Sequence, residues 1–390
     1  MTNRVITYSI VTLIYLLISP VTVTQGAPRI ESPDKMNAFE GIDEIVFAVR
    51  AVGNDGHWYA NFGYRAENAK NMMYGRDGGR LCALNVRTGK LRTILDAGRG
   101  SVRDPHVHYD GKKILFSRRK GGSIYYHLCE INTDGTGLKQ LTDGEFDDLE
   151  PVYLPDGGIM FVSSRCKRWV NCWHTQVAVL YRCDADGSNM QVLSANIEQD
   201  NTPWVMPNGG ILYTRWEYVD RSRVKYHHLW TMNPDGTGQM VYYGNMHQGT
   251  VMIDAKPIPG TEDVLTLFSP GHGQKEHAGQ VTIVSAKHGP DAQSEAQILH
   301  AAKNFRDPYP VTKDVFLVAQ EGSIVLMNRD GDMRKVYSLG KREQAYWVHE
   351  PRPLRGRQRE PVIPSRVMPK QDTGYVNLQR QKWQEHRHAV

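Results

Sequence analysis

The sequence predicts an all-β protein, a six-bladed β-propeller with four antiparallel strands in each blade. Three features that recur along the 390-residue chain predict it. An acidic or polar residue stands before proline, or once before alanine, at intervals of 43 to 53 residues. A run of β-branched and aromatic residues follows each of these dipeptides, and an Asp-Gly turn usually comes after the next such run. The dipeptides are Asp104-Pro105, Glu150-Pro151, Thr202-Pro203, Asp254-Ala255, Asp307-Pro308 and Glu350-Pro351.

Each repeat has the order of elements expected of a propeller blade. A leader strand starts at the dipeptide, and a second strand follows it, as in KKILFS from Lys112 or GIMFVSS from Gly158. After a longer loop, a third strand ends in a turn such as NTDGTG from Asn132, and a fourth strand completes the repeat. A composition of 36 glycines, 20 prolines and 19 tyrosines suits short strands joined by many turns. A β-sandwich would not require a fixed period, and hairpin-joined strands do not form solenoid coils.

The blade number follows from the two ends of the repeat array. The first repeat, roughly 41–95, contains EIVFAVR from Glu44 and a later strand GGRLCALNV, but it has no leader. The last dipeptide, Glu350-Pro351, has no further strands behind it. We therefore expect the C-terminal leader to enter the first blade and close the ring, which removes open sheet edges. This gives six blades, and seven is the alternative.

The N-terminus has the pattern of an export signal. Arg4 precedes an apolar stretch at Val5–Ser19, Pro20 interrupts it, and small residues follow before Ala27. This pattern predicts a signal peptide at residues 1–26 and a periplasmic or extracellular protein. The alternative is an uncleaved anchor, which would be the only expected contact with a membrane.

Two further segments are expected after the signal peptide: a propeller at residues 40–360 and a basic tail at 361–390. From Pro351 onward, nine Lys and Arg residues face three acidic ones, although the whole chain carries a net charge of only +5. A basic tail can contact nucleic acid or anionic lipid, but a solvated end is the more common case. We therefore expect no nucleic-acid partner.

Five cysteines bear on the redox environment. Cys166 and Cys172 lie in one short segment, RCKRWVNCW, and in an oxidising compartment they would form a disulfide. A metal or thiol site is the alternative. There is no C-x-x-C, so C-x-x-C-H attachment of haem is absent and no haem is expected.

The leader acids are the strongest candidate site, because leader strands line the central channel of a propeller. The expected ligand-binding residues of this funnel are Asp104, His106, Glu150, Asp254, Asp307 and Glu350. Carboxylates this close repel one another unless a cation compensates them, so Asp104, Glu150 and Asp254 are predicted to bind Ca²⁺ or another divalent cation. Alternatively the acids are structural, accepting hydrogen bonds from neighbouring blades or pairing with Arg103 and Arg306.

A glycine-rich segment, SPGHGQKEHAG from Ser269, offers a second candidate. His272 and His277 lie five residues apart with Glu276 between them, so they are alternative metal ligands or a general base. The alternative is that these histidines form hydrogen bonds at the protein surface and bind no ligand.

Aromatic residues near predicted loops and strand ends can stack on sugar rings, or they can pack blades together. They are Trp58, Tyr59, Trp169, Trp173, Trp204 and Trp216.

Several long motifs are specific enough to compare with known families. They include VRDPHVHYDGKKILFS from Val102, DLEPVYLPDGGIMFVSSRCKRWVNCW from Asp148, YHHLWTMNPDGTGQMVYYGN from Tyr226 and EPVIPSRV from Glu360. These motifs resemble the propeller middle domain of the hydrazine synthase alpha-subunit family, and the blades are similar to TolB-type propellers over about residues 40–370. In that family haem domains flank the propeller, whereas this chain has no haem motif. TGYVNLQ from Thr373 reads like the first strand of a further domain.

Two functions remain open at this point. The first is an exported, non-catalytic binding or scaffold module, whose partner is a small molecule or an exported cytochrome-like protein that supplies the haem domains in trans. The second is a metal-dependent enzyme acting on a small molecule or glycan at the funnel. Fold class alone does not decide between them.

Overall fold

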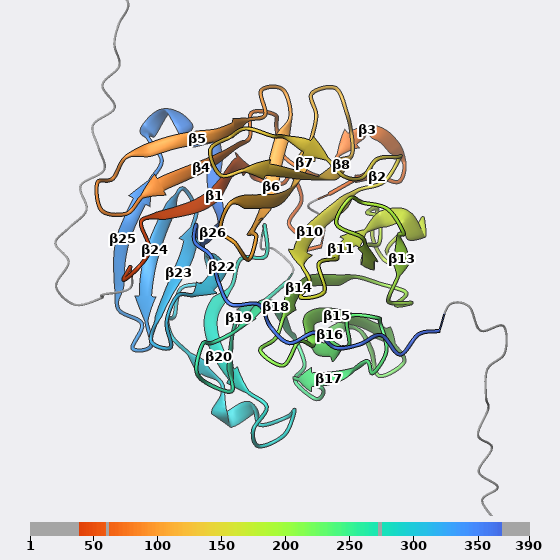
Figure 1. The fold of residues 1–390 in the computed structure, drawn as a ribbon. Helices are drawn as coiled ribbons and strands as arrows, with labels where there is room; N and C mark the ends of the chain where they lie inside the picture. Colours follow the sequence, from red (N-terminus) through yellow and green to blue (C-terminus); the bar gives the residue numbers. More distant parts are fainter. Residues whose placement is uncertain (1–38, 60–61, 272–274, 369–390) are drawn as a thin grey trace, which may run out of the picture.

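The computed structural model describes residues 39–368 except 60–61 and 272–274, and its regular structure is almost entirely β-strand (Figure 1). The strands are β1 (Glu44–Ala51), β2 (Tyr64–Arg65), β3 (Asn68–Met72), β4 (Arg80–Asn85), β5 (Leu91–Asp96), β6 (Ser101–Val107), β7 (Lys113–Arg119), β8 (Tyr126–Asn132), β9 (Lys139–Gln140), β10 (Asp148–Tyr153), β11 (Ile159–Ser163), β12 (Val179–Cys183), β13 (Gln191–Val192), β14 (Asp200–Val205), β15 (Ile211–Val219), β16 (Ser222–Met232), β17 (Met240–Tyr243), β18 (Thr250–Pro257), β19 (Asp263–Ser269), β20 (Gln280–Ser285), β21 (Gln297–Ile298), β22 (Phe305–Pro310), β23 (Val315–Gln320), β24 (Ser323–Asn328), β25 (Met333–Ser338) and β26 (Tyr346–Pro353). The 3-10 helices are η1 (Ser164–Cys166), η2 (Gln293–Glu295) and η3 (Lys341–Glu343). The predicted all-β class is confirmed.

Some sequence predictions concern other parts of the chain. The signal peptide at 1–26, His272 and the TGYVNLQ segment from Thr373 lie outside the described residues. Within the described ranges, no helix has the length and apolar character needed to span a bilayer.

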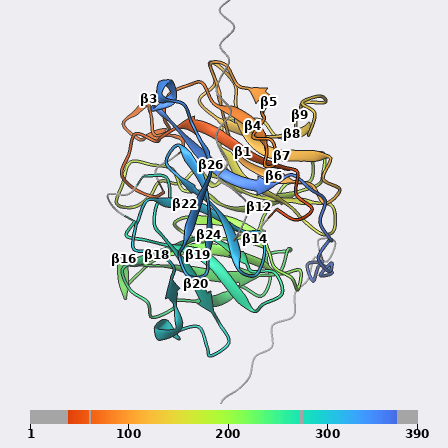
Figure 2. The same cartoon turned by 90° about the vertical axis from the view of Figure 1, so that its left-hand side faces the viewer.

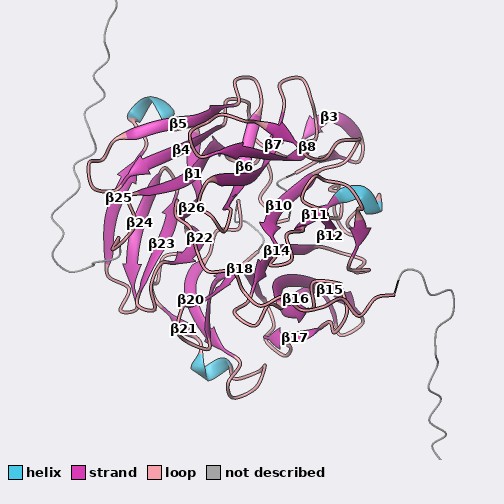
Figure 3. Cartoon of the chain, in the orientation of Figure 1, coloured by secondary structure: helices cyan, strands magenta, loops and turns pink. Residues whose placement is uncertain are grey.

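Most of the sheets are built from strands that follow one another in sequence. β6–β9, β10–β13 and β22–β25 each form a four-stranded antiparallel sheet. The strands β14–β17 and β18–β21 are joined into one larger sheet, because β16 pairs in parallel with β18 at Tyr226–Thr250 and His227–Val251. Figures 1 and 3 show these sheets around a common centre, with β6, β10, β14, β18, β22 and β26 nearest to it.

The two ends of the repeat array meet in one sheet. β26 pairs antiparallel with β1, from Ile45 opposite Pro353 to Ala51 opposite Tyr346, and the sheet order is β26-β1-β4-β5. Figure 2 shows β1, β26 and β6 next to one another. Val348 is fully buried in the apolar layer between this sheet and β22–β25. The sequence-based prediction that the Glu350 segment enters the sheet of the first repeat is therefore confirmed.

After β26 the chain runs over one face of the molecule in an extended conformation, and we call residues 354–368 the C-terminal strap (Figure 1). Arg357 N donates to Tyr109 O at 3.0 Å, and Arg366 N donates to Asp235 Oδ2 at 2.6 Å. Gly209 lets the strap approach closely, because a Cβ at this position would lie 2.2 Å from the Pro361 carbonyl oxygen. The first part of the predicted basic tail is thus held against several sheets.

The predicted disulfide between Cys166 and Cys172 is wrong for this structure, in which both thiols are free. Cys166 ends η1, and its Sγ donates to the Val177 carbonyl oxygen at 3.3 Å. Cys172 is exposed and hydrogen-bonds with Tyr59 instead. Short spacing alone does not make two cysteine side chains point toward each other.

Candidate functional site

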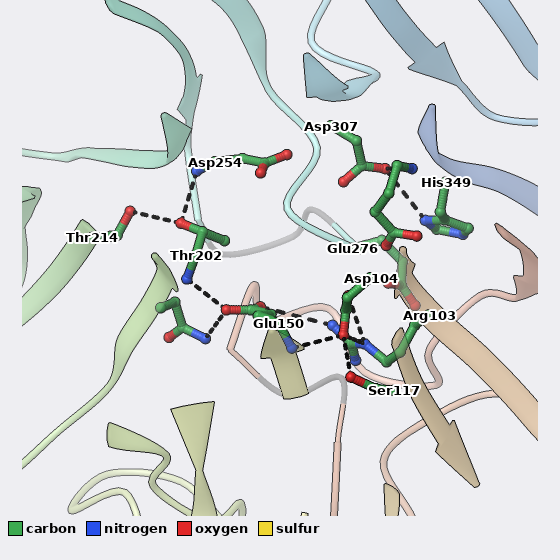
Figure 4. Close-up of polar contacts among 12 residues, drawn as sticks. Arg103, Asp104, Ser117, Glu150, Thr202, Thr214, Asp254, Glu276, Asp307 and His349 are labelled. Atoms are coloured by element: carbon green, nitrogen blue, oxygen red, sulfur yellow. Dashed lines mark hydrogen bonds and ion pairs between the residues drawn. The ribbon is translucent and has the colours of Figure 1, made fainter. Parts of the chain in front are cut away.

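Six equivalent leader residues share a left-handed backbone conformation. They are Asp104, Glu150, Thr202, Asp254, Asp307 and Glu350, with φ between 48° and 62°. At each of them the pairing with the neighbouring strand shifts register, as between Arg103 and His106 in β6. A non-glycine residue in this conformation costs on the order of 1 kcal/mol or more, so its surroundings must hold it there. Figure 4 shows five of these side chains converging on the centre of the molecule.

Hydrogen bonds connect consecutive leaders around the centre (Figure 4). They run from Glu150 N to Asp104 Oδ2 (2.9 Å), from Thr202 N to Glu150 Oε2 (2.5 Å), from Asp254 N to Thr202 Oγ1 (3.1 Å) and from Glu350 N to Asp307 Oδ2 (3.0 Å). Arg103 also pairs with Asp104 at 2.9 Å and with Glu150 at 3.8 Å. These contacts match the structural alternative given for the leader acids, in which they accept hydrogen bonds from neighbouring repeats or pair with Arg103. Metal ligation by Asp104, Glu150 and Asp254 stays a prediction.

Two of the carboxylates keep one oxygen without a hydrogen bond. Among the described residues, Asp254 Oδ2 and Glu350 Oε2 are buried and have no hydrogen-bond partner. The other oxygen of Asp254 accepts from Lys256 Nζ at 2.6 Å, and that of Glu350 accepts from Arg50 Nη2 at 3.3 Å. A buried polar atom without a partner is costly, so these two oxygens are where a ligand would gain most.

Asp307, His349 and Glu350 form a group of possible metal ligands. One ligand atom from each lies within 4.8 Å of the others, and all three side chains are buried. His349 Nδ1 is 3.6 Å from Asp307 Oδ2, and neither ring nitrogen has a hydrogen-bond partner in the described part of the chain. His349 was not among the residues predicted from sequence. It directly precedes its leader acid, as Arg103 and Arg306 do in other repeats, and that shared position was the available clue.

A loop from outside the leader strands contributes Glu276 and His277. Glu276 is buried, pairs with Arg50 at 2.7 Å and accepts a hydrogen bond from Gly53 N at 2.6 Å. His277, proposed from sequence as an alternative ligand, is buried and faces the same centre, where Trp58 packs near it with ring centroids 6.0 Å apart. The aromatic residue Trp58 is therefore a packing residue, 1% exposed.

Burial and neighbouring charges separate the acids into two kinds. Burial, followed by the nearby charge of Asp307, raises the pKa of Glu350 to about 8. Burial and Asp104 raise the pKa of Glu150 to about 7. Burial also acts to raise the pKa of Glu276, but Arg50 and other cations outweigh it and lower the value to about 2. Near neutral pH the site thus combines fixed carboxylates with carboxylic acids that can give up a proton.

These residues surround a small cavity of about 40 Å³, which we call the inner cavity. Its wall includes Asp104, His106, Glu150, Asp254, Asp307 and Glu350, together with Glu276, His277 and Arg352. All six residues predicted for the funnel are therefore brought together. The volume suits a few waters or a single ion with part of its hydration shell. Burial is the largest of several causes that hold the pKa of His106 well below its ordinary value. This histidine is therefore neutral.

Comparisons with known proteins place this architecture among β-propellers. No protein-family model matches the chain. Hydrazine synthase subunit alpha of Kuenenia stuttgartiensis is 24% identical over an alignment of 191 residues, and the match covers 35% of this chain and 23% of that protein. The solved Kuenenia stuttgartiensis hydrazine synthase matches with a TM-score of 0.68 and 19% identity, over 83% of this chain and 48% of that chain. TolB from Acinetobacter baumannii matches with a TM-score of 0.54 and 14% identity, over 80% of this chain and 67% of that chain.

The match therefore spans less than half of the hydrazine synthase chain. At these identities, the structural matches establish the fold, a propeller like that of TolB. The chain is similar to hydrazine synthase subunit alpha in both sequence and fold.

Proposed function

We propose that the chain is an exported six-bladed β-propeller that serves as a binding module and holds a divalent cation at Asp307, His349 and Glu350. The sheet order supports six blades of four antiparallel strands if the larger sheet is divided between β14–β17 and β18–β21. The pairing of β26 with β1 supplies the leader of the first blade.

Export and location rest on the N-terminal pattern, which points to the periplasm or the extracellular space. The partner that we propose is another exported protein, because the similar Kuenenia stuttgartiensis protein is named as a subunit. We propose a cytochrome-like protein in trans as this partner, from the resemblance to a family in which haem domains flank the propeller.

The observation that carries the cation proposal is the buried His349 imidazole. Both of its nitrogens, like Glu350 Oε2, lack a hydrogen-bond partner among the described residues, and Asp307 lies beside them. A metal ion would bind one of these nitrogens together with one carboxylate oxygen each from Glu350 and Asp307. One imidazole and two carboxylates suit Mn²⁺, Fe²⁺ or Zn²⁺ better than Ca²⁺, the cation expected from carboxylates alone.

Glu350→Gln and Glu150→Gln form a matched pair that tests this proposal. Both acids occupy the same repeat position and both are buried, but only Glu350 belongs to the proposed ligand group. The full chain would be stripped with chelator, reloaded with Mn²⁺ or Zn²⁺, desalted and analysed by plasma mass spectrometry. We expect about one metal per chain in the wild type and in Glu150→Gln, and loss of metal in Glu350→Gln and His349→Ala.

Two results would contradict the proposed ligands. The first is a wild-type protein that retains neither metal. The second is loss of metal in Glu150→Gln but not in Glu350→Gln, which would return the site to Asp104, Glu150 and Asp254. Circular dichroism and thermal melting of every variant would identify losses caused by unfolding.

A metal-dependent enzyme is the second candidate function. It is supported by Glu150, which lines the inner cavity and whose pKa burial raises to about 7, because an acid that stays protonated near neutral pH can donate a proton to a leaving group. The substrate would be a small molecule or a glycan. Turnover that requires both the metal and Glu150 would favour the enzyme over the binding module.

A further inference from the structure

A second cavity lies on the face of the propeller that the C-terminal strap crosses, and we call it the outer cavity. Its volume is about 540 Å³, within the range of small-molecule sites. Trp204, Tyr309 and several prolines form its apolar walls, and strap residues from Arg357 to Pro361 form another side. An adjoining cavity of about 200 Å³ extends it to Arg352.

The charged groups around these two cavities are mostly cationic. Five basic residues line them, namely Lys256, Arg352, Arg355, Arg357 and Arg359, against the single acid Glu360. Glu360 is already engaged, since its Oε2 accepts a hydrogen bond from the Tyr109 hydroxyl at 2.6 Å. The outer cavity therefore differs in charge from the acid-lined inner cavity and favours an anion.

Arg352 is the group that an anion would satisfy. Its side chain is 7% exposed, and its guanidinium carbon lies 5.2 Å from the ring centroid of Trp204 and 5.4 Å from that of Tyr309. In the described part of the chain its Nε has no hydrogen-bond partner, and its charge acts on the buried Asp307 carboxylate, whose pKa it helps to lower, without a direct ion pair. Within the described ranges it donates one long hydrogen bond, from Nη1 to Pro351 O at 3.4 Å. A buried guanidinium in this state gains strongly from a bidentate carboxylate or phosphate.

The strap keeps the outer cavity formed. Arg357 Nη1 donates to Val107 O at 2.6 Å, and Arg359 Nη1 donates to Pro155 O at 2.9 Å. Both guanidinium groups also lie over the ring of Tyr109, at 4.1 and 4.8 Å from its centroid. A wall fixed in this way does not have to be ordered when a ligand binds, which lowers the cost of binding.

We propose that the outer cavity binds a small organic anion whose carboxylate or phosphate pairs with Arg352 and whose planar apolar body packs against Trp204, Tyr309 and the prolines. Arg352, Trp204 and His106 also line the inner cavity, so the bound anion lies next to it. The inference does not depend on the cation site, because Arg352 and Trp204 are outside the proposed ligand group.

Titration of the full chain with defined probes tests the proposal. Benzoate and phenyl phosphate carry the two anionic groups on a flat ring, and inorganic phosphate carries the charge alone. Calorimetry and tryptophan fluorescence should detect saturable binding of at least one aromatic probe, with inorganic phosphate binding more weakly. Comparing benzoate with phenyl phosphate identifies the preferred anionic group. Arg352→Met should weaken binding about tenfold or more, as expected for a lost charge-assisted pair.

Arg215→Met is the matched control, because Arg215 also lies over a tryptophan, 4.7 Å from the Trp230 centroid, but pairs with Asp200 at 3.2 Å. It should leave the affinity for the probes unchanged. Arg352→Lys keeps the charge and should bind more weakly than wild type but more tightly than Arg352→Met. Absence of binding by both aromatic probes, or equal affinity in wild type and Arg352→Met, would overturn the proposal. Metal content measured on the same samples separates this outcome from failure of the cation site.

Discussion

Glu350 donates its backbone N–H to Asp307 Oδ2 at 3.0 Å, while its own Oε2 has no hydrogen-bond partner among the described residues. The leader hydrogen bonds thus hold Glu350 in place without using its carboxylate fully. At Glu150 the equivalent oxygen accepts from Thr202 N at 2.5 Å. The same repeat position therefore carries a satisfied acid in one repeat and a partly unsatisfied acid in another, and only the second has an atom available for a ligand.

Removal of the Arg50 charge should destabilise the protein strongly. Arg50 is buried and pairs with Glu276 and Glu350, at 2.7 and 3.3 Å. Arg50→Met leaves the buried Glu276 carboxylate without its main partner, which typically lowers the free energy of unfolding by ~3–5 kcal/mol. Chemical denaturation would measure the change, and the double variant Arg50→Met/Glu276→Gln should recover part of it.

Arg87→Met is the control for that prediction. Arg87 pairs with Asp43 at 2.9 Å, but both side chains are well exposed, and such pairs contribute about 0–1 kcal/mol. An effect of Arg50→Met no larger than that of Arg87→Met would show that the central ion pair is not a stabilising contact.

The contact between Gly209 and the strap predicts a different response for two equivalent turn glycines. Gly209 and Gly157 have similar positive φ values, 85° and 94°, so alanine brings similar backbone strain at both. Only at Gly209 would the new Cβ meet the Pro361 carbonyl oxygen, at 2.2 Å, whereas nothing lies within 4 Å at Gly157. Gly209→Ala should therefore release the strap and speed tryptic cleavage after Arg359, relative to Gly157→Ala. Equal cleavage rates in the two variants would contradict the close approach.

Loss of β26 should destabilise the whole fold, because this strand completes the sheet of β1. A chain ending at Gln344 lacks the strand and the buried Val348. Its free energy of unfolding should be lower than that of the full chain by ~3 kcal/mol or more. A chain ending at Met368 keeps β26 and the strap and serves as the control. If both chains melt cooperatively at the same temperature, β26 does not contribute as the pairing indicates.

The repeats explain which features could be predicted from sequence. Equivalent positions in a repeat lie at equivalent places around the centre, so the convergence of Asp104, Glu150 and Asp307 followed from their spacing alone. The role of Glu276 could not be predicted from sequence, because Glu276 comes from a loop outside the repeat and pairs with Arg50 from 226 residues away in sequence. The disulfide prediction failed for a related reason, since the spacing of Cys166 and Cys172 does not fix side-chain direction.

The outer cavity could not be predicted from the sequence either. The sequence shows Arg352 only as part of a basic C-terminal segment, because neither charge nor periodicity indicates that residues 354–368 cross the face of the propeller. The packing of the strap against Tyr109 and Gly209 converts that segment into a wall of a cavity. Sequence reasoning therefore located the repeated part of the site and missed the parts built by loops and by the strap.

Protonation of Glu150 predicts how stability depends on pH. Burial and Asp104 raise its pKa from the ordinary 4.5 to about 7 in the folded protein. Below pH ~4.5 the group is protonated in both the folded and the unfolded chain. As the pH rises from there to about 7, the unfolded chain loses the proton first, so ionisation favours unfolding. The stability associated with the neutral form is fully present at low pH and is lost as the pH passes through the folded-state value.

Glu150→Gln should remove this dependence, because the amide cannot ionise and its oxygen can still accept the hydrogen bond from Thr202 N. The stability of the variant relative to wild type should rise between about pH 4.5 and pH 7 by a few kcal/mol, since one pKa unit corresponds to about 1.4 kcal/mol. Above that range the difference should stay constant. Urea denaturation between about pH 4.5 and pH 7 measures this difference in stability, with the exposed Glu145→Gln as control. A difference that does not change with pH, or that falls as the pH rises, would mean that Glu150 is ionised in the folded protein throughout, with Arg103 outweighing its burial.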